Sequence, residues 1–237
     1  MRFGFFIAAL FAAGCSGPGP GPQDAGSHVS AALQACADVR EPARVTTIAA
    51  AVTRINALPL PVTAPCFVAS LPRPIELVAT NSVFSAQPAH SRESPRMFIF
   101  LPALVASVVP EGEGAEVIEF SQWMTPTRTL KGELAVPIEG PVAADAPFTK
   151  VHSNFGVTSC GLCHRNEEAH PTIDGGFISD AFRPNSGSLI AVSELKAMHD
   201  ACGEEDQSPR CELFHALFDF GEVKQGAFSS SVDLFVQ

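Results

Sequence analysis

The sequence contains few charged residues and no cluster of positive charge. Only 17% of its 237 residues are Asp, Glu, Lys or Arg, and 15 scattered basic residues stand against 25 acidic ones, which gives a net charge of −10. Binding to a nucleic-acid backbone needs clustered Lys and Arg, so these counts argue against a nucleic-acid partner. Apolar residues make up 46% of the chain, which is typical of a folded globular protein.

The sequence also lacks an apolar run long enough to cross a bilayer, which takes about 20 residues in a helix. It contains no phosphate-binding loop, no Ser–His–Asp arrangement, no paired-carboxylate signature and no internal repeat. With these enzyme signatures absent, the chemistry must be sought in the seven cysteines and the histidines near them.

The first 14 residues have the pattern of a bacterial signal peptide. Arg2 provides a positive start, and the apolar run that follows, residues 3–13, is too short for a membrane span. Residues 11–15 (FAAGC) resemble the lipobox of bacterial lipoproteins, which implies a lipid on Cys15. Ala12 stands where Leu is usual in that family, so cleavage by an ordinary signal peptidase is the alternative.

Residues 15–26 are rich in glycine and proline, which favour neither helix nor sheet, so we expect a flexible tether. A signal peptide, a lipidated cysteine and a tether together predict an exported protein on the periplasmic side of a bacterial membrane. We expect an outer-membrane lipoprotein that meets the membrane only through its lipid anchor.

Beyond the tether, the periodicity predicts an α+β protein with two regions. Residues 27–145 begin with a helical pattern up to about Leu60 and continue as a β-rich antiparallel sheet or sandwich. The clearest alternation runs from Leu130 to Ile138, with Thr129, Lys131 and Glu133 at the polar positions. Other expected strands are residues 66–69, 75–78, 97–109 and 117–120.

Residues 146–237 form the second region, a small helical segment. One helix is expected over residues 192–202. Another is expected to begin after Ser208 as N-cap, with Pro209 in its first position and Gly221 beyond its end.

The most specific motif is Cys160-Gly161-Leu162-Cys163-His164, a CxxCH sequence. Two thiols at this spacing can each add to one vinyl group of a porphyrin, and the adjacent histidine can ligate the iron. With seven Cys and seven His in the chain, chance would produce the motif in about 0.006 of such chains. The motif resembles that of c-type cytochromes. The resemblance implies one covalent haem c, attached at Cys160 and Cys163, with His164 as the proximal iron ligand.

The motif does not identify the sixth iron ligand. Met198 is the only methionine after it and is the first candidate, although its spacing with Leu195 and Cys202 also suits a helix core. His170, His199 and His215 are alternatives, as is an open distal site. The segment before the motif lacks the amphipathic helix of small cytochromes.

The remaining cysteines can be paired in an oxidising compartment. If Cys15 carries lipid and the motif carries haem, four cysteines are left. The pairings nearest in sequence are Cys36 with Cys66 and Cys202 with Cys211, although spacing alone does not fix connectivity.

Three functions follow. The first is a membrane-tethered electron carrier with a redox partner protein that the sequence does not reveal. The second is a haem enzyme or sensor with an open distal site. In joining a β-rich domain to one CxxCH, the chain resembles the lysine-cross-linked c-type haem proteins that oxidise hydroxylamine, although no specific lysine can be carried over. The third is a binding lipoprotein whose CxxC is a disulfide or thioredoxin-like dithiol, or binds zinc with His164 and Cys202 or Cys211.

Overall fold

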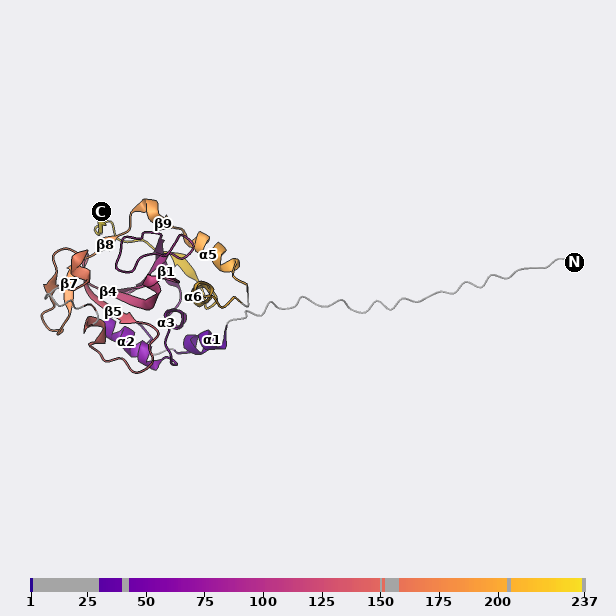
Figure 1. The fold of residues 1–237 in the computed structure, drawn as a ribbon, viewed down its shortest axis with the longest axis horizontal. Coiled ribbons are helices and arrows are strands. Elements are labelled where there is room, and N and C mark those ends of the chain that lie inside the picture. The colour runs from indigo at the N-terminus through magenta and orange to yellow at the C-terminus, as the bar shows by residue number, and fades with distance from the viewer. Residues whose placement is uncertain (2–29, 40–42, 150, 152–157, 204–205, 236–237) are drawn as a thin grey trace.

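The computed structural model describes residue 1 and residues 30–39, 43–149, 151, 158–203 and 206–235 of the chain. Apart from Met1, the expected signal peptide lies outside these residues, as do the tether and Cys15. Within them the fold is α+β, with a large, mostly antiparallel sheet and six α-helices (Figure 1). No helix in this part of the chain is long and apolar enough to cross a membrane.

Nine strands form the main sheet. Strands β1 to β5 lie side by side in chain order and run antiparallel; β7 and then β6 continue the sheet beyond β5. At the other edge β10 pairs in parallel with β1, which also pairs with β9. The bounds are β1 Ile75–Thr80, β2 Arg96–Leu101, β3 Leu104–Val108, β4 Val117–Thr125, β5 Arg128–Ala135, β6 Glu168–Ala169, β7 Phe177–Asp180, β9 Leu189–Ile190 and β10 Val223–Gln225. Two short strands, β8 (Phe182–Arg183) and β11 (Asp233–Leu234), pair separately.

The helices begin where hydroxyl side chains cap them. Ser30, Thr47, Thr63 and Ser208 each accept a backbone N–H of the first turn of α1, α2, α3 and α6. The expected start of the last helix is therefore confirmed, with Pro209 as its first residue. The bounds are α1 Ala31–Ala37, α2 Ile48–Ala57, α3 Ala64–Ser70, α4 Ala146–Thr149, α5 Val192–Asp200 and α6 Pro209–Phe218.

One expected strand is wrong. Residues 66–69 form the middle of α3, because Thr63 accepts the N–H of Cys66 and Pro65 occupies the first turn. A disulfide joins Cys66 to Cys36 of α1, which ties the two helices together. Four consecutive apolar residues are consistent with either a buried strand or a buried helix, and here the cap and the cross-link favour the helix.

The sheet also crosses the boundary expected between residues 145 and 146. β7 pairs with β5, and β10 pairs with β1, so the region expected to be helical supplies strands to both ends of the sheet. The expected run 97–109 is divided into β2 and β3, which turn back on each other after Leu101.

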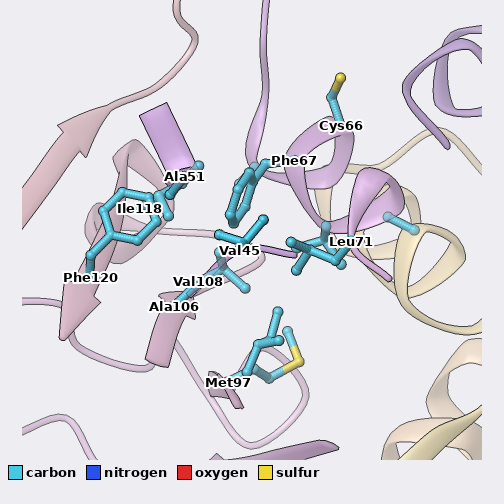
Figure 2. Packing of buried hydrophobic residues seen from close by; sticks show 14 of the residues in the cluster. Val45, Ala51, Cys66, Phe67, Leu71, Met97, Ala106, Val108, Ile118 and Phe120 are labelled. Atoms are coloured by element: carbon cyan, nitrogen blue, oxygen red, sulfur yellow. The ribbon is translucent and has the colours of Figure 1, made fainter. Parts of the chain in front are cut away.

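The core lies between one face of the sheet and the helices. Figure 2 shows Phe67 of α3 directed toward Ile118 and Phe120 of β4, and the rings of Phe67 and Phe120 meet edge to face with centroids 5.9 Å apart. Met97 of β2 and Ala106 of β3 are fully buried in the same cluster. Alternate residues of these strands face the opposite side of the sheet, where the candidate site lies.

Candidate functional site

The CxxCH motif forms a tight turn just before the last strands of the sheet. Cys160 to Leu162 make one turn of 3₁₀ helix. The carbonyl of Cys160 accepts the N–H of Cys163 at 3.1 Å and the N–H of His164 at 2.8 Å. These two bonds close the loop, so both cysteines and the histidine are held on one short piece of backbone.

A second set of contacts clamps the turn from outside. The Glu167 carboxylate accepts the N–H of Thr158 at 2.9 Å and also the hydroxyl of Thr158. A Cβ at Gly161 would lie 2.8 Å from the same carboxylate, so only glycine allows Glu167 to approach this closely. Glu167 therefore supports the motif loop.

His164 is oriented as a metal-ligating histidine requires. Its Nδ1 lies 2.6 Å from the backbone carbonyl of Asp180 at the end of β7, so Nδ1 carries the proton and donates it there. The ring stacks on Phe182, with centroids 5.4 Å apart. Burial lowers the pKa of His164 to about 3, which keeps the imidazole neutral. In this tautomer Nε2 carries a lone pair, and none of the described residues forms a hydrogen bond with it.

The thiols of Cys160 and Cys163 are free, whereas the other four described cysteines are joined as Cys36–Cys66 and Cys202–Cys211. Burial and, to a smaller extent, Glu119 raise the pKa of the Cys160 thiol to about 11. A catalytic dithiol needs a lowered thiol pKa, so this environment disfavours the thioredoxin-like alternative. The zinc alternative loses its further ligands, because Cys202 and Cys211 bond to each other.

The motif lines a pocket on the sheet face opposite the core. The pocket has a volume of about 1270 Å³, including the solvent at its mouth, and Cys160, Cys163 and His164 all contribute to its wall. Strands β1 to β5 form its floor. Aromatic side chains make up much of the rest: Phe84, Phe98, Trp123, Phe182, Phe228 and Phe235.

Four charged groups stand on the floor of this pocket: Arg96 of β2, Glu119 of β4, and Lys131 and Glu133 of β5. Arg96 of β2 and Glu119 of β4 form an ion pair at 2.5 Å, and the Arg96 guanidinium also lies over the Phe98 ring at 4.6 Å. Lys131 of β5 is only 5% exposed, and burial lowers its pKa to about 8, against smaller opposing effects led by Cys160.

Sequence reasoning did not assign a role to Arg96, Glu119 or Lys131. One signal was present, because Lys131 occupies a polar position of the clearest alternating strand. The alternation of the strand indicates which face of the sheet Lys131 occupies. It does not indicate that this face is shielded from solvent and forms a pocket. Trp123 also lines the pocket.

The candidate sixth ligands lie elsewhere. Met198 packs partly buried against the core from α5, and His199 and His215 meet between α5 and α6. Figure 1 places these two helices at the end of the domain opposite β7. His170 Nδ1 accepts the N–H groups of Thr172 and Ile173 in the loop between β6 and β7. None of the four candidates lines the pocket that contains His164.

Comparisons with known proteins give no relative: no family model, no curated protein and no solved structure matches this chain. The functional argument therefore rests on the residues of the site.

Proposed function

We propose that the protein carries one covalent c-type haem in this pocket and that an exogenous small molecule binds at its iron. The observation that carries the proposal is His164, a neutral imidazole with Nδ1 bonded to a backbone carbonyl, at the wall of a pocket beside two free thiols. Backbone carbonyls commonly orient metal-ligating histidines in this way.

The pocket suits a haem in its chemistry. Its aromatic walls match a flat apolar macrocycle. Arg183, which also lines it, offers a cationic group for carboxylates. The pocket therefore contains a group of the right type for each part of the haem.

Each residue of the motif has a distinct part in this proposal. Cys160 and Cys163 would hold the group through thioether bonds, and His164 Nε2 would bind its iron. The aromatic walls would exclude water from the iron. When bound, the haem supplies an iron centre able to exchange electrons or bind small ligands, tuned by its axial ligand and surroundings.

The residues that line the pocket favour ligand binding over simple electron transfer at a haem held by His164. Among the described residues that line the pocket, His164 is the only histidine and there is no methionine. Lys131 is the only lysine in that lining, and it provides a specific amine for the resemblance to lysine-cross-linked haem proteins. These observations support a haem enzyme or sensor with an open distal site more than a six-coordinate carrier ligated by Met198.

Location belongs to the same proposal. We infer export by the segment 1–14 and anchoring by lipid on Cys15, with the domain held near membrane-bound redox partner proteins. Cys15→Ala should abolish incorporation of a labelled fatty acid into the protein, while unchanged labelling would contradict lipid anchoring.

The first test is a haem stain after denaturing electrophoresis of the chain expressed with c-type maturation machinery. We expect a stained band that disappears in Cys160→Ala/Cys163→Ala, because both thioether bonds are lost. Cys202→Ala/Cys211→Ala is the matched control, since it removes two cysteines far from the pocket and should keep the stain. No band in the exported native chain would overturn the haem proposal.

Spectroscopy then separates the two haem functions. A five-coordinate ferrous haem that binds carbon monoxide would support the open site, and Lys131→Met should alter that spectrum while Met198→Leu leaves it unchanged. A six-coordinate spectrum lost in Met198→Leu would instead assign the protein as an electron carrier.

A further inference from the structure

A second cluster of ligand-type side chains lies away from the pocket, between α5 and α6. His199 comes from the last turn of α5, His215 from the last turn of α6, and Asp219 caps the end of α6. One ligand atom from each of the three residues lies within 4.8 Å of the other two. The cluster is partly buried, with side chains 13%, 18% and 16% exposed.

The helix hairpin holds these residues in place. The disulfide between Cys202 and Cys211 joins the end of α5 to the start of α6. His199 lies three residues before Cys202, and His215 lies four residues after Cys211. Residues three or four apart share one helix face, so the two histidines come together one turn beyond the disulfide, and their ring centroids are 5.2 Å apart.

The polar contacts of the cluster cannot all be satisfied unless an additional positive charge is present. His199 Nε2 lies 2.7 Å from Asp219 Oδ1, and His199 Nδ1 lies 3.0 Å from Asp200 Oδ1. A neutral imidazole has only one N–H, so it can satisfy one of these carboxylates but not both. At the other nitrogen, two lone pairs would face each other unless a proton or a metal ion lies between them.

His215 likewise has a ring nitrogen that the cluster leaves without a partner. Its Nδ1 lies 2.7 Å from Asp219 Oδ2, whereas its Nε2 is buried and has no hydrogen-bond partner in the described part of the chain. Asp219 thus presents one oxygen to each histidine. The carbonyl ends of α5 and α6 contribute further negative potential, which favours a cation at this point.

We propose that His199, His215 and Asp219 form a binding site for a divalent cation of the zinc type. Two imidazole nitrogens and one carboxylate are a common zinc ligand set, which leaves a fourth position for water or an anion. Asp200 would act from outside by accepting the Nδ1 proton of His199, which leaves Nε2 free to bind the metal. Because Asp200 also pairs with Lys196, its contribution is smaller than that of a direct ligand.

The proposal is tested with Zn²⁺ on the full-length oxidised chain. Equilibrium dialysis with metal analysis should give one tightly held Zn²⁺ on the Cys160→Ala/Cys163→Ala background, which removes the free thiols as competing ligands. His199→Ala and Asp219→Ala should abolish this binding, and Asp200→Ala should weaken it about ten-fold as expected for an outer-shell partner. His90→Ala, at an exposed histidine outside the cluster, should bind as the parent does.

X-ray absorption at the zinc edge identifies the ligands independently of any haem. We expect nitrogen and oxygen neighbours at about 2.0–2.2 Å and no sulfur. Circular dichroism checks the fold of each variant, and Asp219→Asn or His199→Gln replaces any that unfolds. Absence of saturable binding, sulfur in the first shell, or unchanged binding in the His199 and Asp219 variants would overturn the site and leave a hydrogen-bonded His–Asp cluster.

Discussion

The two faces of the central sheet follow the same alternation but differ in what they bury. On β2, Met97 and Ile99 face the helices and are completely buried, while Arg96 and Phe98 face the pocket. The first face is filled by aliphatic and aromatic side chains at core density. The second combines ionic groups with aromatic rings around open space, which is costly for stability unless a ligand fills it.

Strand β5 shows the contrast between two adjacent residues. A Cβ at Gly132 would meet Pro147 Cβ at 3.1 Å and Ile48 Cδ1 at 3.2 Å, so the core packs closely against the strand there. Its neighbour Lys131 points to the other side, where burial lowers the pKa of the amine to about 8. The comparison indicates that one face of the sheet supports the fold and the other supports a function.

The largest expected effect is on the packed face. Phe67→Ala removes a fully buried ring that packs edge to face on Phe120, and it should lower the free energy of unfolding by about 3–5 kcal/mol. Phe84→Ala, at a pocket residue that is 56% exposed, should change it by less than about 0.5 kcal/mol. Urea unfolding of the disulfide-intact chain measures both, and similar losses would contradict the assignment of the two faces.

A smaller effect of opposite sign is expected at Lys131 when no haem is present: replacing this lysine should raise the free energy of unfolding. The folded pKa of about 8 lies below the ordinary 10.5, so between these values the unfolded chain binds more protons than the folded chain. The Lys131 contribution to stability therefore rises from pH 8 to pH 10.5, and its cost is complete below pH 8. No tyrosine titrates in this window, because the chain has none.

Lys131→Met on the Cys160→Ala/Cys163→Ala background should raise the free energy of unfolding by roughly 2–3 kcal/mol at pH 7 and reduce its rise between pH 8 and pH 10. Urea titrations at both pH values measure the difference from the parent. Equal stability of the two chains at pH 7 would mean that the amine is well solvated in the pocket.

Local signals predicted the elements that depend on local chemistry. The start of α6 followed from Ser208 and Pro209, and β5 followed from its alternation, because caps and strand faces depend on neighbouring residues. The helix at residues 64–70 was missed because an apolar run of four carries no periodicity, and its cross-link to Cys36 is distant in sequence. Pairing of β7 with β5 is equally non-local, so the extent of the sheet could not be read from the chain.

The candidate site divides in the same way. Cys160, Cys163 and His164 were identified because their spacing is itself the signal. Arg96, Glu119 and Lys131 come from three different strands, and they converge only through strand register, which places Ser107 opposite Glu119 and Ser121 opposite Lys131. The carbonyl of Asp180 that orients His164 has no side-chain signature at all.

The smallest expected effect on the free energy of unfolding concerns Glu167, which holds the CxxCH turn through Thr158. Glu167→Ala removes the acceptor for both the N–H and the hydroxyl of Thr158, which is buried, so we expect a loss of about 1–2 kcal/mol in unfolding free energy. Glu168→Ala is the matched neighbour: that side chain is 59% exposed and pairs with Arg128 at the surface, and its loss should be within about 0.5 kcal/mol.

Because the clamp holds the CxxCH turn, Glu167→Ala should also lower the fraction of chains that acquire covalent haem, measured by the haem stain per unit protein. If both variants stain and unfold alike, the turn is held by its own backbone bonds, and Glu167 has no special part in presenting Cys160, Cys163 and His164 to the pocket.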